Sequence, residues 1–534
     1  MSADALPAVA PPPPVPPAAP PRSADKADLT AWLGVAAGAI GSLMATLDIS
    51  IVNASLPTIQ GEIGASATEG TWIATAYLVA EIIIIPLTGW LERVFGLRRF
   101  LMIATTLFTA FSIVCGLADS LLMMILGRVG QGFTAGAMIP TALTIIATRL
   151  PPRQQPIGTS LFGLTVIMGP VLGPLVGGWL TENLSWHYAF FVNIPISLLL
   201  MTLLLIGLPK GQMKLSELVN ADWLGVVGLI LGLGGITVVL EEGHREQWFE
   251  SALIWQLSGV TLLGFLLVGL GQVYARRPVI KLALLRKREF SAVFILALVL
   301  GAVMFGTAYV IPQFLAAIAG YNAMQAGKIV FLSGIPAMMM MPLFPILITR
   351  VDLRIIVGIG VGLLAISCAL DINLTAEARG DDFVTTQLLR GLGTVFCMMF
   401  LNQAAISSVP REDAGDAAGL FNAGRNLGGS IGLALLATLQ DERWEMHRWN
   451  IHSSLKANDP AIQDWLGQQA ANFGGGPEGL EAAFRSIDGQ VLRDALVMSF
   501  NDDFLALTIG ILIVWPLVLL LRPLPKGYHA KAAH

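Results

Sequence analysis

The chain has 534 residues, of which 55% are hydrophobic and only 13% are charged. Soluble domains average about 25% charged residues, so this composition excludes a soluble protein and predicts an integral membrane protein. The formal net charge of -4 at pH 7 is small and gives no indication of a nucleic-acid partner.

Residues 1–28 are rich in proline and alanine and are predicted to form a disordered tail. From residue 29 onward, apolar segments of about 20 residues recur, each long enough to cross the bilayer as a helix. The sequence therefore predicts an all-α membrane protein with fourteen transmembrane helices. The predicted spans are residues 31–56, 70–91, 99–117, 121–148, 158–180, 188–208, 222–240, 252–273, 290–315, 326–348, 354–371, 383–409, 416–439 and 501–521.

Basic residues are distributed unevenly between the loops. The loops that follow even-numbered spans contain sixteen Lys and Arg residues, whereas the short loops that follow odd-numbered spans contain only Arg245 and Arg379. Short cytoplasmic loops collect basic residues. The alternation therefore predicts that both termini are cytoplasmic.

An internal repeat relates the two halves of the chain. LGRVGQG at residues 126–132 is similar to LLRGLG at residues 388–393, and each lies eight spans from its counterpart. We therefore predict two six-helix bundles with two inserted transmembrane helices between them. The boundaries are a tail at 1–28, a first bundle at 29–208, inserted helices and a basic linker at 209–289, a second bundle at 290–521 and a tail at 522–534.

The loop at residues 440–500 is long and polar, with helical patterning at 461–473 and 478–500. Long loops cross the membrane regardless of their charge, so this loop is predicted to face the outside. Two interpretations remain open, a solvated cap and a docking surface for an extracytoplasmic partner.

Small residues and prolines recur every four positions in the span at 158–180. This spacing places the glycines on one helix face, where two backbones can approach closely. The pattern indicates a hinge or a tight conformational seam, and the alternative is ordinary helix packing. The residues of this pattern are Gly169, Pro170, Gly173, Pro174, Gly177 and Gly178.

Ionisable residues inside the membrane are costly and are therefore functional candidates. Asp48 lies roughly 13 Å below the outer face and Arg128 about 10 Å below it, using 1.5 Å of rise per residue. We predict that Asp48 carries the coupling proton and that Arg128 is its basic partner. The alternative is a helix cap or a static ion pair.

Glu81 lies near the membrane midplane. It is a second candidate for proton coupling, or a carboxylate that meets cationic substrates, or a protonated acid with a structural hydrogen bond. The first span of the second half has no acid between Phe290 and Ile318, so we expect the coupling acid in the first half. The polar candidates of the second half are Arg390, Asn422, Arg425 and Asn426.

A substrate cavity for varied molecules would need apolar, adaptable side chains. Tyr77, Phe162, Met338 and Met341 are candidates, although methionines more often serve simple packing. Enzymatic and metal chemistry find no support, because the chain has no GxxxxGK[ST] phosphate loop and its histidines have no metal-ligand spacing. No cofactor is expected, and an ion gradient is the predicted energy source.

Five stretches together resemble the major facilitator superfamily, and within it the fourteen-helix drug:proton antiporters of EmrB/QacA type. The long outer loop is closer to the EmrB side. The stretches are LDISIVNASLPTI (47–59), GWLERVFGLRR (89–99), RVGQG (128–132), GPVLGPLVGG (169–178) and WHYAFFVNIP (186–195).

The resemblance implies that Asp48 is the proton-coupling acid, Arg128 its partner and Gly169–Gly178 the antiporter seam. It also implies a role for the loop after the second span, whose residues here are Gly89, Glu92, Arg93, Gly96, Arg98 and Arg99. The family pattern expects an acid where this chain has Arg93. That departure puts in question the contact between bundles that the acid would make.

We therefore expect a proton-coupled multidrug efflux antiporter of a bacterial inner membrane, exporting amphipathic, hydrophobic or cationic compounds. By the resemblance, a periplasmic membrane-fusion adaptor and an outer-membrane channel are candidate partners. One alternative is a dedicated exporter of a single metabolite, fatty acid or siderophore. A second is a non-transporting receptor or scaffold that acts through the loop at 440–500.

Overall fold

The computed structural model describes residues 26–151, 154–214, 216–219, 221–275, 278–410, 413–455 and 459–522. Within these ranges the regular structure is entirely helical. Twelve of the described helices are long and apolar enough to cross a membrane, and the bent helix α7 makes up to thirteen. The prediction of an all-helical, multi-span membrane protein is confirmed. Of the two predicted tails, residues 1–25 and 523–534 lie outside the described ranges.

The first bundle follows the predicted spans closely. The predicted span 121–148 is divided into two helices at Gly136, where an added Cβ would lie 2.8 Å from the Glu81 carbonyl oxygen. The helices are α1 (Leu29–Glu62), the short α2 (Ala67–Gly70), α3 (Trp72–Phe95), α4 (Leu97–Gly116), α5 (Leu121–Ala135), α6 (Met138–Arg149), α7 (Gln155–Asn183), α8 (Tyr188–Phe191) and α9 (Asn193–Gly207).

Two inserted helices connect the bundles. Helix α11 contacts both α3 of the first bundle and α19 of the second, so the insertion spans the boundary between the two halves. The elements of this region are α10 (Ser216–Val219), α11 (Trp223–Gly243), η1 (Trp248–Glu250), α12 (Ala252–Tyr274) and η2 (Leu282–Arg286).

The second bundle contains the remaining spans. The predicted span 326–348 is broken into several short helices, and Pro342 and Pro345 lie at these breaks because proline cannot donate a backbone hydrogen bond. The elements are α13 (Arg288–Ala317), α14 (Ala323–Phe331), α15 (Gly334–Met340), η3 (Met341–Leu343), α16 (Phe344–Arg350), α17 (Leu353–Leu370), η4 (Asp371–Asn373), η5 (Gly380–Asp382), α18 (Phe383–Ser407), α19 (Ala414–Ser454), α20 (Pro460–Asn472), α21 (Gly476–Val514) and η7 (Trp515–Leu520).

The two bundles repeat the same helix pairing. In the first bundle α1 packs along α7, and in the second α13 packs along α19. Both pairs join the first and fifth spans of their half. Glycines mediate both contacts, since an added Cβ at Gly173 would lie 2.1 Å from Ser50 Cβ and one at Gly428 would lie 2.0 Å from the Leu298 carbonyl oxygen.

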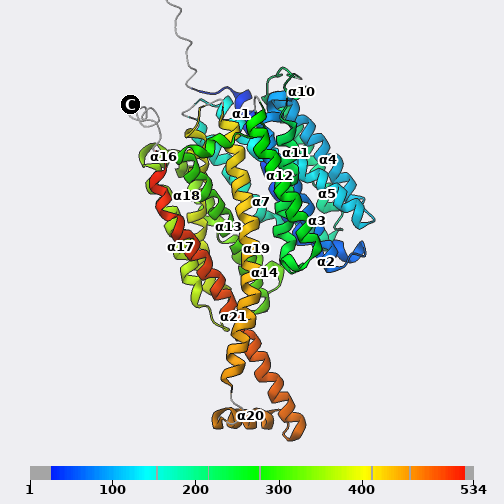
Figure 1. Ribbon diagram of the computed structural model, residues 1–534, viewed down its shortest axis with the longest axis vertical. Helices are drawn as coiled ribbons and strands as arrows, with labels where there is room; N and C mark the ends of the chain where they lie inside the picture. Colours follow the sequence, from blue (N-terminus) through cyan, green and yellow to red (C-terminus); the bar gives the residue numbers. More distant parts are fainter. Residues whose placement is uncertain are drawn as a thin grey trace, which may run out of the picture.

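Residues 440–455 and 459–500 form a helical projection, which we call the stalk. The predicted span 416–439 does not end at the membrane boundary, because α19 continues to Ser454 and is 41 residues long, or about 60 Å. Helix α21 returns antiparallel to it, and α20 lies across the far end (Figure 1). The helical patterning predicted at 461–473 and 478–500 is confirmed. The start of α1 and the end of η7 lie at the opposite end of the molecule, which we call the basic end.

The small-residue face of α7 packs against α1 on both sides of Asp48. An added Cβ would lie 2.0 Å from Thr46 Oγ1 at Gly169 and 2.8 Å from the Ile51 carbonyl oxygen at Gly177, whereas one at Gly178 would meet nothing within 4 Å. The seam therefore lies within the first bundle, and Gly178 is not part of it.

Pro170 and Pro174 face away from this contact and are exposed. The two halves of α7, Gln155–Pro170 and Leu172–Asn183, meet at an angle of 42°. A proline inside a helix removes one hydrogen bond and pushes against the carbonyl four residues earlier. The sequence itself therefore accounts for the bend.

Replacing Gly173 with alanine should destabilise the first bundle by about 1–3 kcal/mol, because the new methyl group overlaps α1 at Ser50. Gly178→Ala is the matched control, since it adds the same methyl group to the same helix in open space. Thermal unfolding in detergent measures both variants, and equal melting temperatures would contradict the proposed close contact.

Candidate functional site: a buried acid–base network

Asp48 of α1 lies at the centre of a fully buried polar network in the first bundle. Its Oδ2 accepts a hydrogen bond from Arg128 Nη1 of α5 at 2.5 Å. Its Oδ1 accepts one from Gln131 Nε2 at 3.1 Å and one from Asn193 Nδ2 of α9 at 2.7 Å. Three donors aimed at one carboxylate stabilise its ionised form. In this conformation Asp48 is therefore the acid of a buried ion pair with Arg128.

Arg128 has a second set of contacts that does not involve Asp48. Its Nε donates to the Ile73 carbonyl at 3.1 Å, and its Nη1 also donates to Gln131 Oε1 at 3.0 Å. The guanidinium carbon lies 4.2 Å from the centre of the Tyr77 ring, a favourable cation–π distance. These contacts hold the guanidinium in place independently of its bond to Asp48.

Ser112 of α4 is also part of the network, through the two side-chain amides that bond to Asp48. Its Oγ accepts hydrogen bonds from Gln131 Nε2 at 2.8 Å and from Asn193 Nδ2 at 3.2 Å. Asp48 and Arg128 were predicted from the sequence, but these three supporting residues were missed. Gln131 lies three positions after Arg128 and so shares its helix face, and Asn193 lies inside the WHYAFFVNIP stretch. Nothing in the sequence marked Ser112.

Glu81 of α3 is buried where the first bundle meets the second, with 4% of its surface exposed. Helix α3 contacts α19 directly. Of the cations that act on Glu81, Arg425 of α19 has a stronger electrostatic effect than Arg128. An acid of the first bundle therefore faces a base of the second bundle, and Asn426 Oδ1 accepts hydrogen bonds from that base.

At the basic end, charged residues from three regions form an inter-bundle ion cluster of Arg93, Lys281, Asp413 and Asp416. Arg93 Nη1 of α3 lies 3.4 Å from Asp416 Oδ1 of α19, and Lys281 Nζ of the linker lies 3.4 Å from Asp416 Oδ2 and also pairs with Asp413. An added Cβ at Gly89 would lie 3.0 Å from Asp416 Oδ1. The family pattern expects an acid at position 93. Here Arg93 places a base on α3, and this base contacts the acid Asp416 on α19 of the second bundle.

Partial burial alone lowers the pKa of Lys281, but the hydrogen bond to Asp413 and the charge of Asp416 outweigh it, so the pKa lies above its ordinary value of 10.5. A base with a raised pKa contributes its full stabilisation below its unfolded pKa and loses it as the pH rises through the folded pKa. Lys281 therefore stays charged across the physiological range.

Two other residues of the loop motif, Gly96 and Arg98, lie at helix ends. Gly96 adopts a φ of +77° between α3 and α4, a backbone conformation that favours glycine. Arg98 Nη1 donates to the Leu208 carbonyl at 3.2 Å, at the end of α9. Glu92 faces Thr141 and Thr144 of α6, and Arg99 is exposed.

The second bundle contains a buried ion pair that was not predicted from the sequence. Arg390 Nη2 of α18 lies 2.6 Å from Asp371 Oδ2, and Nη1 donates to Gln387 Oε1 at 3.2 Å. Buried acids therefore occur in both halves of the chain. In the second half the acid, Asp371, comes from the end of the predicted span 354–371 and not from α13, the counterpart of α1. Asn422 donates to the Ala418 carbonyl of its own helix.

The predicted cavity residues are separated in space. Tyr77 is fully buried beneath Arg128, and Phe162 is 3% exposed. Met341 lies at the bundle boundary, because an added Cβ at Gly163 of α7 would lie 3.1 Å from its Cε. Met338 is half-buried on α15. Of these residues, Phe162 is part of α7 and Met341 contacts it.

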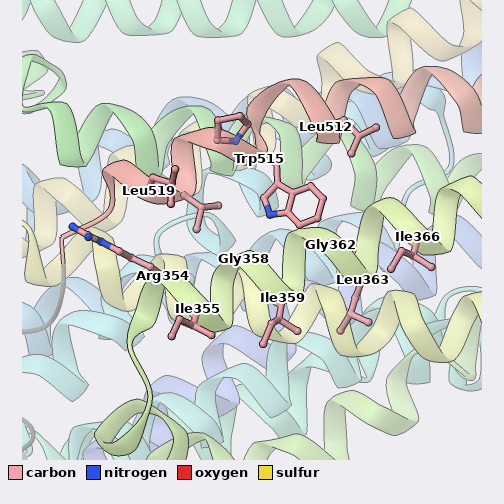
Figure 2. Close-up of a pocket in the computed structure, with 12 residues that line it drawn as sticks. Arg354, Ile355, Gly358, Ile359, Gly362, Leu363, Ile366, Leu512, Trp515 and Leu519 are labelled. Atoms are coloured by element: carbon pink, nitrogen blue, oxygen red, sulfur yellow. The ribbon is translucent and has the colours of Figure 1, made fainter.

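A groove of about 790 Å³ lies on the outer surface of the second bundle, between α17 and the end of α21 with η7 (Figure 2). Its lining is apolar, with Trp515 over Gly362 and with Arg354 at one end. Ile355 and Leu519 on its rim are 57% and 73% exposed. It contains no predicted site residue and belongs to the surface that faces lipid.

Within the described ranges, no group of three or more His, Cys, Asp or Glu residues could hold a metal ion. The interior of this multi-helix membrane bundle contains the buried acid–base pairs Asp48–Arg128 and Asp371–Arg390. Buried pairs of this kind are typical of membrane transporters. The family model of the Major Facilitator Superfamily matches residues 38–433. The chain belongs to this superfamily.

Three relatives are similar over most of their length. The colistin resistance protein EmrB of Acinetobacter baumannii is 32% identical over 89% of this chain and 93% of its own. The multidrug export protein EmrB of Escherichia coli K12 is 30% identical over 87% and 90%. The fatty acid resistance protein FarB of Neisseria gonorrhoeae is 28% identical over 92% and 96%.

Solved structures show the same fold at low sequence identity. A variant of the peptide transporter POT in complex with sulfate matches with a TM-score of 0.56 and 16% identity over 91% of this chain and 95% of its own. The resemblance to the superfamily's EmrB-type members, inferred from the sequence motifs, is confirmed.

Reversing the charge of Arg93 to Glu should weaken the contact between the bundles, because it places a like charge beside Asp416. Asp416→Asn removes the partner charge without placing a like charge beside Lys281, so Arg93→Glu should cost less in the Asp416→Asn background. A double-mutant cycle of thermal unfolding should give a coupling energy of about 0.5–1 kcal/mol, since Arg93 is partly exposed.

Arg99→Glu is the matched control, because it makes the same charge change on an exposed residue of the same loop. A coupling energy of zero between the Arg93 and Asp416 substitutions would show that this ion pair does not hold the bundles together.

Proposed function

We propose that the chain is a proton-coupled exporter of amphipathic drugs that works by alternating access. The observation that carries this proposal is the buried Asp48–Arg128 pair, together with the EmrB relatives whose names describe multidrug export and colistin resistance. A fully buried acid is expensive inside a membrane protein. A coupling role explains why it is there.

Proton binding at Asp48 is the step that couples the gradient to the conformation. A proton on the carboxylate neutralises it and weakens its bond to Arg128, while Arg128 keeps its contacts with Ile73, Gln131 and Tyr77. The change therefore falls on α1, which is released from α5. Charge-assisted hydrogen bonds are about twice as strong as neutral ones, so protonation of Asp48 removes a large part of the interaction energy between Asp48 and Arg128.

Helix α7 transmits this movement to the second bundle. Its glycines contact α1 at Thr46 and Ser50, two residues on either side of Asp48. The same helix contacts α14, α15, η3 and α16 across the bundle boundary. A shift of α1 therefore reaches the second bundle through α7, which is closely packed against both. Because packed interfaces have discrete arrangements, small shifts are amplified.

We further propose that the basic end faces the cytoplasm of a bacterial inner membrane and that the stalk faces the periplasm, following the distribution of basic loops. The inter-bundle ion cluster then closes the cytoplasmic side in this conformation. Trp449, Phe473 and Phe484 of the stalk are exposed. Exposed aromatic residues of this kind support a docking surface for a periplasmic adaptor.

A second candidate function is export of fatty acids, because one relative carries the name fatty acid resistance protein. Uptake of unrelated cationic dyes and of long-chain fatty acids into inverted vesicles distinguishes the two. Transport of several unrelated dyes supports the multidrug proposal, whereas transport of fatty acids alone supports the alternative. A receptor or scaffold would transport neither.

Asp48→Asn should abolish transport driven by a pH difference, because the amide keeps the shape of the side chain but cannot bind and release a proton. Exchange driven by a substrate gradient alone should persist. Proteoliposomes with and without an imposed pH difference provide the measurement, and Asp488→Asn, an exposed acid of the stalk, is the control. Unchanged pH-driven transport would remove Asp48 from the coupling role.

Glu81→Gln should reduce export of cationic substrates at least tenfold while leaving neutral substrates within about threefold. The reason is that the carboxyl group of Glu81, buried at the bundle boundary, can ionise beside a cationic substrate, whereas the amide of glutamine cannot. Hydrogen bonds to charged groups are worth about 1.5–3 kcal/mol. Export rates of a quaternary ammonium dye and a neutral dye test this. Equal losses for both dyes would assign Glu81 to proton coupling or to packing.

A further inference from the structure

Asp503 of α21 is a buried acid that the proposed mechanism does not use. Its side chain is completely buried, with 0% of its surface exposed. Neither carboxylate oxygen has a hydrogen-bond partner among the described residues. Asp48 and Asp371, by contrast, each pair with an arginine. Asp503 is therefore a buried carboxyl group without the donors that would stabilise a negative charge.

The local structure gives no other role for this acid. It lies in the interior of α21, far from both helix ends, so it caps no helix. Nearby, Asn501 exchanges two hydrogen bonds with the backbone of Leu374, and the rings of Phe500 and Phe314 are in contact. These contacts fix the position of α21 without Asp503. An apolar residue at position 503 would leave them intact and would avoid the free-energy cost of burying a carboxyl group.

The groups around Asp503 do not supply a counter-charge. From α13, Tyr309 is within electrostatic range of both Asp503 and Asp441 of α19. Arg443 and His447 of α19 face the neighbouring Asp502, whose Oδ2 lies 3.5 Å and 2.9 Å from them. Asp502 itself adds negative charge beside Asp503.

Among the described residues, the remaining elements that pack against α21 also supply no counter-charge to Asp503. Arg390, the base nearest to η4, is already bonded to Asp371, and Cys368 of α17 lies beside that pair. Arg354 is at the far end of α17, where it donates to the Leu521 carbonyl. Helix α20 lies at the tip of the stalk, and η7 carries no titratable side chain.

An isolated carboxylate in a low-dielectric interior is unstable, and such a group takes up a proton and becomes neutral. We propose that Asp503 is a second proton-carrying acid of the transport cycle, which holds its proton in the conformation where Asp48 is ionised. This inference rests on the proposed proton-coupled function. It adds one coupled proton per cycle, bound by the second bundle.

The position of Asp503 fits exchange with the stalk side. Asn501 bonds to the backbone of Leu374, in the loop at the stalk end of α17. Asp503 is two residues further along α21, or about 3 Å along the helix axis. Asp502 and His447 next to it are partly exposed, with side-chain exposures of 26% and 14%. In this proposal, these two groups relay the proton between solvent and Asp503. The proton leaves Asp503 when the second bundle rearranges, and the carboxylate then becomes ionised.

Substrate accumulation at a fixed pH difference tests this proposal. Each coupled proton contributes a factor of about ten to the final substrate ratio for each pH unit. In proteoliposomes with a pH difference of one unit and no membrane potential, Asp503→Asn should lower the final ratio of a quaternary ammonium dye about tenfold. Asp488→Asn, which removes an exposed acid from the same helix, should leave the ratio unchanged.

The outcomes separate this inference from the function on which it rests. If the wild-type ratio does not respond to the pH difference, the proton-coupled function fails and Asp503 has no coupling role. If the wild type responds and Asp503→Asn has the same ratio, the second proton is refuted and the function stands. A purely structural acid predicts that equality, because asparagine is isosteric with the protonated side chain.

Infrared difference spectroscopy provides a readout that does not depend on transport. Purified wild-type protein should show a protonated-carboxyl C=O band at neutral pH that Asp503→Asn removes and Asp488→Asn retains. Asp503→Glu, which keeps a titratable group, should retain the band and the full substrate ratio. Absence of an Asp503-dependent band would overturn the proposal even if the asparagine variant transported poorly.

Discussion

The structure depends on one buried ion pair, in which the Asp48 carboxylate and the Arg128 guanidinium are 2.5 Å apart and fully excluded from solvent. Removing one partner from a buried pair typically costs about 3–5 kcal/mol because the other charge is left uncompensated. Helices α1, α4, α5 and α9 therefore converge on this point, each contributing a polar side chain. Protonation of Asp48 exerts the same kind of destabilisation reversibly, which makes the pair suitable for coupling.

Each bundle contains a buried acid–base pair, but the two pairs use different helices. The first bundle pairs Asp48 with Arg128, and the second pairs Asp371 with Arg390 but draws the acid from a different helix of the repeat. Between the bundles, Glu81 faces Arg425, and the basic end is held by the ion cluster around Asp416. The internal repeat therefore preserves the helix pairing, with glycines at both close contacts, while the charges have diverged.

Much of the fold could be predicted from the sequence, because hydrophobic length and the distribution of basic loops are local properties. The positions of Asp48, Arg128 and the glycine face of α7 followed from the cost of charge in the membrane and from helix periodicity. Asp371, Asp416 and Asp503 were overlooked because each lies within a few residues of the end of a predicted span, where an acid is easily assigned to the loop. Their partners, or the lack of them, depend on tertiary packing that no local pattern encodes. The continuation of α19 into the stalk was missed for a similar reason, since a polar helix carries no membrane signal.

The central claim is that proton binding at Asp48 is coupled to export, so that substrate binding and proton binding oppose one another. Proton release on substrate binding tests it most directly. Purified protein in weakly buffered detergent solution is mixed with a quaternary ammonium compound at a pH where the wild type is partly protonated, and released protons are counted with an indicator dye. The account predicts that Asp48→Asn releases fewer protons per bound substrate than the wild type, by the fraction of Asp48 that is protonated before binding. Equal release from the two proteins would contradict it.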